Sequence, residues 1–394
     1  MLAALVGVGV AFGLGAAARP LASTEPLVAL VSRPGGSALV RVDPATLAPV
    51  DGPRVDLSSY VWPWAYSPDR SRVALYDGRA IEIVDLAAMR VVRRSKPLGT
   101  VGQLAWLSPR RLVALYRYAV AFVDPATGRV VRRAFFDGEI VTATQAGARL
   151  LALVAPYTVI GRPRLLVADG SGRVRTVMLR RIRAGRDTQR LTVRTPALAA
   201  DVAGSRLFVL GGDGPVAEVD LRKLSVRYHT LGRSFDKAPL LGPTRYAAWL
   251  GGGLIAVAGE DGRGKVVSGE LHSATVPSGL QLVDTRSWTV RTLDPGATRT
   301  AAADGRVIAY GVTWGEDDFV GAGMGLAIYA RDGSRVAHLF GSTPIQRVQI
   351  VGSRAFVDGQ SPTSVVDLDS GAVVGQLPGF APDLLVGDSR EWSG

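Results

Sequence analysis

Cysteine is absent from the 394 residues of this chain, and asparagine is absent as well. Without thiols the protein cannot form disulfides, thiolate zinc sites, iron–sulfur clusters or a covalently attached haem. Because there is no cysteine, cysteine usage cannot indicate whether the protein works in an oxidising or a reducing compartment. Because the chain has no asparagine, aspartate and glycine must supply its tight turns.

Motifs of common enzyme classes are also missing: no G-x-S-x-G, H-E-x-x-H or P-loop pattern occurs. Gly321, Gly323 and Gly325 form a G-x-G-x-G run, but no helical pattern follows it, so it does not predict a phosphate site. We therefore assign no catalytic residue and predict no cofactor.

Lysine is scarce, at positions 96, 223, 237 and 265, yet the net charge is +12 and the pI is about 10.4. A basic chain of this kind either binds an acidic partner, such as nucleic acid or an anionic envelope surface, or reflects a codon bias toward arginine. We favour the codon bias and do not expect nucleic-acid binding.

The N-terminus is uncharged and rich in small residues over positions 2–18, which is typical of a signal peptide. No lysine or arginine precedes the apolar run, which indicates either that the true start lies upstream or that the segment stays as a membrane anchor. A buried helix is the structural alternative. We expect residues 1–23 to be this targeting segment, residues 24–394 to be one domain, and the location to be extracytoplasmic.

A strand that ends in an acidic turn recurs eight times at intervals of 35 to 64 residues. Each of these aspartates is followed within a few residues by another apolar run, which predicts a hairpin. The aspartates that mark the repeats are Asp43, Asp85, Asp124, Asp169, Asp220, Asp284, Asp332 and Asp367.

Two more strands precede each hairpin: one of small residues, such as 103–107, and a bulkier one, such as 111–116. Four antiparallel strands per repeat predict the blades of an all-β propeller, with strands a to d from the axis outward. The first repeat lacks strand a, and a spare strand at 382–387 can supply it. We therefore predict eight blades, with seven as the alternative, closed by a C-terminal inner strand.

Blade 2 (residues 65–92), in which a Ser-Pro-Asp turn joins strands a and b, resembles the YVTN-type repeat of bacterial surface and secreted propellers. The run VDPATGRVV (residues 123–131) is similar to the repeat of quinoprotein-like propellers. The resemblance implies the propeller architecture for nearly the whole chain after residue 26. It does not choose a function, because such propellers include enzymes, binding scaffolds and assembly factors.

Long insertions fall at 155–163, 259–279 and 313–324 between strands b and c, and at 181–196 and 232–243 between blades. In a propeller these connections emerge on one face, so we predict a recognition surface there, on blades 4 to 7. The alternative is that insertions have accumulated, without a function, at positions where the fold tolerates them.

Three segments of this face supply the candidate binding residues. The link between blades 4 and 5 is arginine-rich. It either binds an acidic partner or is a solvent-exposed connection without a binding role. The two long b-to-c insertions carry carboxylates that suit calcium, and a histidine that suits a base. The residues are Arg181, Arg183, Arg186, Glu260, Asp261, Glu270, His272, Trp314, Glu316, Asp317 and Asp318.

Two functions remain open at this stage. The favoured one is an exported, non-catalytic, monomeric propeller that binds a protein, a peptide or an anionic envelope polymer through its long loops. The alternative is a hydrolase or lactonase-like enzyme with a metal near the axis. That enzyme needs carboxylates or histidines on the inner strands, and these strands are small and apolar.

Overall fold

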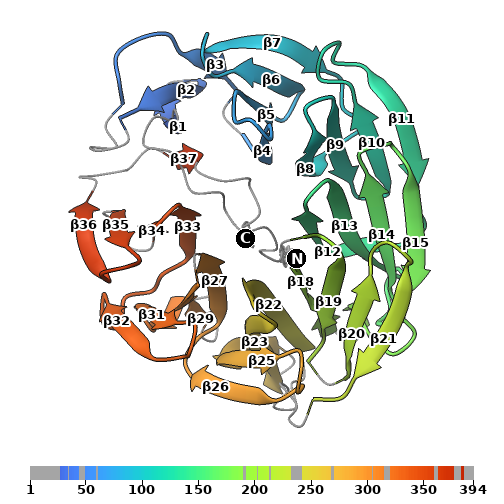
Figure 1. Ribbon diagram of the computed structural model, residues 1–394, viewed down its shortest axis with the longest axis vertical. Coiled ribbons are helices and arrows are strands. Elements are labelled where there is room, and N and C mark those ends of the chain that lie inside the picture. The colour runs from blue at the N-terminus through green and yellow to red at the C-terminus, as the bar shows by residue number, and fades with distance from the viewer. Residues whose placement is uncertain are drawn as a thin grey trace.

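The computed structural model describes residues 27–33, 35–43, 49–58, 61–189, 192–201, 203–212, 214–231, 242–267, 270–303, 305–314, 320–358, 363–376 and 383–385. Within these ranges the chain forms β-strands, and none of it forms a helix long and apolar enough to cross a membrane. The strands build eight four-stranded antiparallel blades around a central axis (Figure 1). The prediction of an all-β, eight-bladed propeller is confirmed. The predicted targeting segment, residues 1–23, lies outside the described residues, and its role stays a prediction.

In the first four blades the strands follow one another from the axis outward. Blade 1 is β37 (Asp383–Leu385), β1 (Leu27–Arg33), β2 (Gly36–Val42) and β3 (Val55–Leu57). Blade 2 is β4 (Trp64–Tyr66), β5 (Arg72–Tyr76), β6 (Ile81–Asp85) and β7 (Arg90–Ser95). Blade 3 is β8 (Val101–Ser108), β9 (Arg111–Tyr116), β10 (Ala119–Val123) and β11 (Val130–Phe135). Blade 4 is β12 (Glu139–Ala146), β13 (Arg149–Ala155), β14 (Arg164–Asp169) and β15 (Val174–Met178).

The other four blades have the same order. Blade 5 is β18 (Ala197–Ala200), β19 (Arg206–Leu210), β20 (Val216–Asp220) and β21 (Ser225–His229). Blade 6 is β22 (Gly242–Gly251), β23 (Leu254–Val267), β25 (Leu280–Asp284) and β26 (Val290–Asp294), with β24 (Glu270–Pro277) added to β23. Blade 7 is β27 (Arg299–Ala303), β28 (Arg306–Tyr310), β31 (Leu326–Ala330) and β32 (Arg335–Leu339). Blade 8 is β33 (Arg347–Val351), β34 (Arg354–Asp358), β35 (Ser364–Asp367) and β36 (Ala372–Gln376).

The ring closes through a strand from the C-terminal end of the chain. β37 pairs antiparallel with β1, in the register Val28↔Leu385 to Leu30↔Asp383. Blade 1 therefore combines three N-terminal strands with one C-terminal strand (Figure 1). This confirms the predicted closure and removes an open edge from β1.

The core lies between blades, and each middle strand is buried on both faces. In β9, Leu112, Ala114 and Tyr116 pack into a cluster with blade 2, whereas Val113 and Leu115 pack with blade 4. Successive strand residues point to opposite faces, which is why these strands read as continuous apolar runs rather than alternating ones. The stacked sheets hold the insertions at fixed positions.

The recurrent aspartates lie at the turns between strands c and d, as predicted, and in seven of the eight, all but Asp43, the structure describes bonds from the side chain to its own turn. Asp124 accepts hydrogen bonds from the Ala126 N–H and the Thr127 hydroxyl, each 2.9 Å long. Such bonds favour the ionised carboxylate. They hold the pKa below its ordinary value at Asp124, Asp220, Asp332 and Asp367.

Tryptophans at the inner strands pack between blades. Trp106 is 2% exposed and donates a 3.0 Å hydrogen bond from Nε1 to the carbonyl of Ala65, which joins blades 3 and 2. Trp249 of blade 6 stacks on Phe208 of blade 5, with ring centroids 5.4 Å apart. The arginine pairs 93–94 and 132–133 lie exposed on the outer strands β7 and β11.

Candidate functional site

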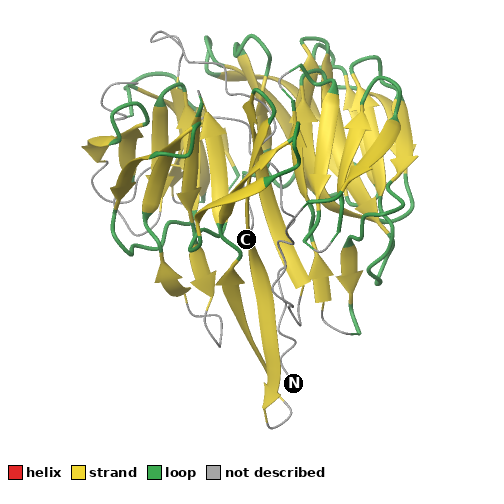
Figure 2. Cartoon of the chain, turned by 60° about the horizontal axis from the view of Figure 1, so that its bottom comes forward, coloured by secondary structure: helices red, strands yellow, loops and turns green. Residues whose placement is uncertain are grey.

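The connections between strands b and c and between successive blades emerge at one end of the ring, which we call the insertion face. The a-to-b and c-to-d turns emerge at the other end, the turn face. The insertions predicted at 155–163, 181–196, 259–279 and 313–324 all belong to the insertion face, where Figure 2 shows the additional strands gathered below the blades. Most of the insertion at 232–243 lies outside the described residues.

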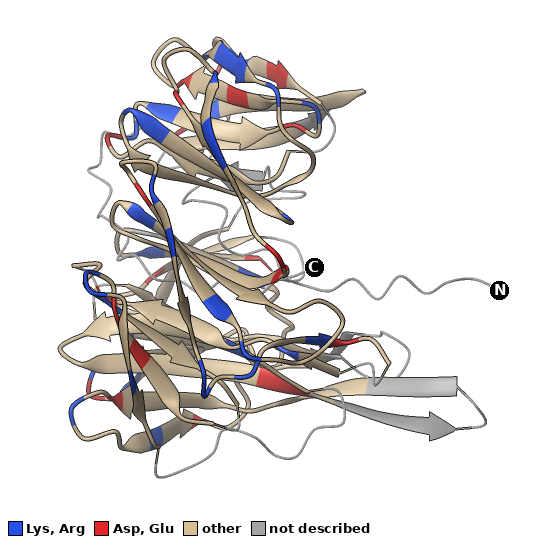
Figure 3. Ribbon diagram, turned by 90° about the vertical axis from the view of Figure 1, so that its right-hand side faces the viewer, with Lys and Arg blue, Asp and Glu red and all other residues tan. Residues whose placement is uncertain are grey.

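Three of these insertions are β-hairpins, whereas the sequence predicted loops. β16 (Gly185–Asp187) pairs with β17 (Thr192–Arg194), and β29 (Val312–Trp314) pairs with β30 (Val320–Gly323). The largest hairpin continues β23 beyond its blade and pairs it with β24, from Glu260↔Pro277 to Val267↔Glu270. The base of this hairpin leaves the ring (Figure 3), and its paired strands extend away from the blades (Figure 2). Pairing with a neighbouring strand satisfies the backbone of each insertion, which a solvated loop would leave to water.

The hairpins join into one structure. Thr195, just after β17, forms a parallel bridge with Thr244 of β22; its N–H donates to the carbonyl of Pro243, and its carbonyl accepts from the Arg245 N–H, each bond 2.9 Å long. β22 pairs with β23, β23 pairs with β24, and β24 contacts β29. We call this series of neighbouring strands the inserted layer; it consists of β16, β17, β22, β23, β24, β29 and β30. It connects blades 4 to 7 across the insertion face.

A buried ion pair fixes the root of this layer. Arg245, at the start of β22, is the largest fully buried side chain among the described residues. Its Nη2 donates to Asp261 Oδ1 at 2.6 Å, and its Nη1 donates to the carbonyls of Thr244 and Glu260 at 3.1 Å. Gly259, opposite Arg245 in the ladder, leaves room for the guanidinium, because a Cβ there would lie 2.8 Å from Arg245 Cδ.

Glu260 lies beside this pair, and the pKa of its carboxyl is above its ordinary value. Burial raises the pKa of its carboxyl, although the charges of Arg299 and Arg245 lower it. Arg299, at the start of β27, also lies over the ring of Tyr246, 5.1 Å from its centroid. Charges from blades 6 and 7 therefore meet where the inserted layer leaves the ring.

The predicted basic residues lie on the link that begins the layer. Arg181 and Arg183 are exposed and alternate with Ile182 and Ala184, which are buried in the core between blades 4 and 5. Neither arginine forms an ion pair with a residue that the structure describes. Arg186, on β16, is half-buried. The link is thus anchored by its apolar residues, and of its two exposed arginines Arg181 has its guanidinium over the Tyr228 ring, 5.4 Å from the centroid.

The predicted acidic residues are not brought together as one exposed group. Asp261 is occupied by Arg245 and has a side chain 1% exposed. Glu270 and His272 lie on β24 and Trp314 on β29, with side chains outside the described part of the structure; Glu316, Asp317 and Asp318 are outside it entirely. Among the described residues no three histidine or acidic side chains could share a metal ion. The calcium site stays a prediction.

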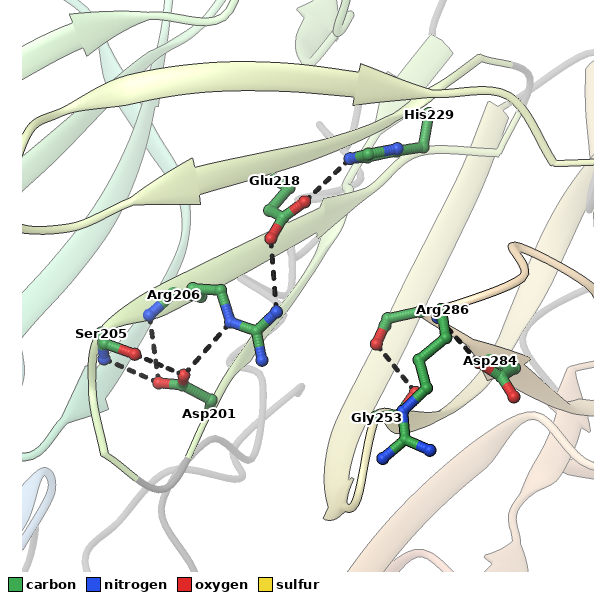
Figure 4. A network of polar contacts seen from close by, with 9 residues as sticks. Asp201, Ser205, Arg206, Glu218, His229, Gly253, Asp284 and Arg286 are labelled. Atoms are coloured by element: carbon green, nitrogen blue, oxygen red, sulfur yellow. Dashed lines mark hydrogen bonds and ion pairs between the residues drawn. The ribbon is translucent and has the colours of Figure 1, made fainter.

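A second polar network joins blades 5 and 6. Arg206 contacts Asp201 at 3.5 Å and Glu218 at 3.4 Å, and Glu218 bonds His229 Nε2 at 2.8 Å (Figure 4). The His229 ring stacks on Trp288 of blade 6, with centroids 3.8 Å apart. His229 thus connects two blades. His338, on β32, bonds the carbonyl of Met324 at 2.9 Å.

Arg245 and Arg299 are the residues of this site that sequence reasoning missed. Each lies near the start of an inner strand whose later residues are mostly small or apolar, a position where a charged side chain is usually solvated. The sequence offered one indication of their role. Two adjacent carboxylates, Glu260 and Asp261, follow β22 on the next insertion, and if they are buried they require a positively charged partner.

No protein-family model matches the chain, and no curated protein matches its sequence. Solved structures match its fold. The dihydro-heme d1 dehydrogenase NirN, in complex with DHE, is similar with a TM-score of 0.58 and 12% identity over 94% of this chain and 76% of that chain. BamB from Moraxella catarrhalis gives 0.49 and 13%, covering 81% and 89%. At such low identity the likeness to NirN shows a propeller fold and nothing finer.

Proposed function

We propose that the protein is an exported, non-catalytic propeller that holds a partner protein on its insertion face. The observation that carries this proposal is the inserted layer: separate insertions of blades 4 to 7 pair into one structure instead of ending as independent loops. A rigid surface loses little conformational entropy on binding, so contacts made by such a layer convert efficiently into affinity.

The inner strands support a binding role over the hydrolase alternative. β18 consists of Ala197, Leu198, Ala199 and Ala200, all buried, and β27 carries three alanines in succession. These apolar residues offer no acid, base or nucleophile toward the axis. Export is proposed from the uncharged, small-residue segment within residues 1–23, and the protein is proposed to act as a monomer.

Shortening the long hairpin tests the proposal. Gly262 and Thr275 are directly paired, so replacing residues 263–274 by Asp-Gly closes the hairpin with a two-residue turn and keeps the Arg245–Asp261 pair. We expect quantitative affinity capture from the native cells to recover one or more partners with the wild type and to lose them with the shortened chain.

The matched control changes the turn face instead. Arg129 and Arg222 are exposed there, at the c-to-d turns of blades 3 and 5, so Arg129→Ala with Arg222→Ala removes charge without touching the layer. Recovery of the same proteins by the wild type and the shortened chain would refute the proposed function. Loss with the control variant would place the binding surface on the opposite face.

A further inference from the structure

Exposed apolar side chains gather on one sector of the insertion face. Among the described residues ten large apolar side chains are exposed, and six of them lie at this end of blades 2 to 4. We call these six the apolar rim: Leu98 (37% exposed), Tyr118 (41%), Phe135 (76%), Tyr157 (37%), Val159 (50%) and Met178 (44%).

Pairing and ring contacts relate the members of the rim on blades 3 and 4 to one another, and Leu98 lies on the connection that leads from blade 2 into blade 3. Phe135 is paired with Ala119, the residue after Tyr118. The rings of Tyr118 and Tyr157 meet edge to face with centroids 5.5 Å apart, which joins blade 3 to blade 4. Met178 is paired with Arg164, where the connection that holds Tyr157 and Val159 ends. The six residues thus follow consecutive strand ends around the ring.

The rim is bordered by positive charge. Arg117 lies over the Tyr118 ring at 5.0 Å, and its contact with Glu139 is long, at 3.9 Å. Arg181 and Arg183 follow Met178 along the chain and are exposed. Arg162, in the blade 4 connection, is exposed as well and forms no ion pair with a residue that the structure describes. Two carboxylates lie on the same border, Glu139 and the exposed Asp137, and these four arginines outnumber them.

This composition matches protein interfaces. Tyrosine, phenylalanine, methionine and arginine are enriched in such interfaces, and the rim with its bordering arginines contains all four. Contiguous exposed apolar surface usually marks a binding site. Aliphatic side chains such as Leu98 and Val159 have no complement in a charged polysaccharide, but they do in a peptide with its own apolar residues.

A membrane surface fits the rim less well. The hairpin β23–β24 stands off the same face (Figure 2). The segment of β23 that pairs with β24, Glu260–Val267, rises about 3.3 Å per residue, or about 25 Å in all. A flat bilayer would meet the hairpin before it reached the rim, whereas a polypeptide can enter beside it.

We propose that the apolar rim, together with Arg117, Arg181 and Arg183, docks an acidic segment of a partner protein that carries apolar side chains between its carboxylates. The rim side chains bury the apolar residues of that segment, and the arginines pair with its carboxylates as the surrounding water is displaced. This inference rests on the proposed function, because it gives the partner of the insertion face its chemistry.

Site-specific photo-cross-linking tests the proposal with the full chain in its native cells. Phe135→p-benzoylphenylalanine places the reactive group at the most exposed rim position, and the same substitution at Val374, 54% exposed on blade 8, is the matched control. We expect Phe135 to yield a protein adduct that Val374 does not. Mass spectrometry of the cross-linked peptide should show a net negative, apolar-containing segment.

The arginines are tested in the chain that carries Phe135→p-benzoylphenylalanine. Adding Arg181→Ala and Arg183→Ala should lower the adduct yield at least about fivefold and weaken its dependence on salt, as expected when two charge contacts are lost. Adding Arg129→Ala and Arg222→Ala should leave the yield unchanged. Both pairs are surface changes, so folding should be preserved.

Several outcomes would overturn the docking proposal: no protein adduct above that of Val374, an adduct to lipid or polysaccharide alone, or a cross-linked segment that is not acidic. The shortened hairpin separates this failure from that of the proposed function. Loss of partners by that variant without a Phe135 adduct would reject the rim and keep the binding role of the inserted layer.

Discussion

The guanidinium of Arg245 donates a 2.6 Å hydrogen bond to Asp261 Oδ1, and the two side chains are each 1% exposed. Arg245 belongs to the inner strand of blade 6, and Asp261 belongs to the part of β23 that has left the blade. The pair therefore ties the inserted layer to the ring at the point where the layer begins. A charge this deeply buried is stabilised by the hydrogen bonds that its guanidinium donates to Asp261 and to two carbonyls.

Removing one partner of this pair should be far more harmful than removing both. We expect Asp261→Ala to lower the free energy of unfolding by about 3–5 kcal/mol, because Arg245 keeps its charge in a buried site. The double variant Arg245→Met with Asp261→Leu should lose much less, because no charge is left unpaired. Urea unfolding gives both values.

The half-exposed pair of Arg347 and Asp358, at 2.7 Å, is the control, since its side chains are 18% and 40% exposed. Arg347→Ala should change the free energy of unfolding by at most about 1 kcal/mol. Equal losses in Asp261→Ala and in the double variant would show that the buried pair is not what stabilises the root of the layer.

Gly259 should not tolerate a side chain. A Cβ there would lie 2.3 Å from the carbonyl oxygen of Thr244 and 2.8 Å from Arg245 Cδ. We expect Gly259→Ala to lower the free energy of unfolding by about 1–3 kcal/mol, because the guanidinium must shift away from Asp261. Gly102→Ala is the control, since its nearest neighbour would be at an ordinary 3.5 Å. Similar melting temperatures for the two variants would contradict this account.

The turn aspartates should make the fold sensitive to acid. Hydrogen bonds from their own turns hold the pKa low at Asp124, Asp220, Asp332 and Asp367, and Asp367 accepts from the N–H and the hydroxyl of Ser370. A carboxyl with a depressed folded-state pKa contributes stability above its unfolded pKa of about 3.9, and loses it as the pH falls through the folded-state value. The free energy of unfolding should therefore fall below about pH 4.

A neutral variant checks the sign of this effect. Changing Asp124, Asp220, Asp332 and Asp367 together to Asn should destabilise the protein at pH 7, and the difference from wild type should shrink toward pH 3. Trp106→Phe, an uncharged core change, should give a difference that does not depend on pH. Urea unfolding at both pH values measures this, and a constant deficit in the Asn variant would rule out the aspartates as the source.

The ring was predictable from sequence because its signals are local and repeated. Aspartates such as Asp124 and Asp367 bond their own turns, and strands such as β9 are apolar throughout because neighbouring blades cover both faces. The hairpin β23–β24 was not predictable in the same way. Gly259, Gly262 and Gly264 interrupt β23 and weaken its strand propensity, so its form depends on pairing with β24.

The apolar rim escaped sequence reasoning for another reason. Tyr118 and Phe135 continue apolar strands. The sequence pattern of those strands does not show at which residue the neighbouring blade stops covering them. Phe135 is 76% exposed, whereas Phe122, on the neighbouring strand of the same blade, is fully buried. Exposure at strand ends is decided by packing between blades, which is a tertiary property.

The closing strand offers the sharpest test of the ring itself. β37 pairs with β1 along three residues, from Val28↔Leu385 to Leu30↔Asp383, and without it the N–H and C=O groups on that side of β1 lose their partners. We expect a chain ending at residue 381 to unfold at a lower urea concentration and to associate in solution, because an unpaired strand edge recruits other strands. A chain ending at residue 387 retains β37 and should match the full chain in light scattering and in unfolding. If both truncations behave alike, the ring is held by packing between its other blades, and the strand borrowed from the C-terminal end adds little to its closure.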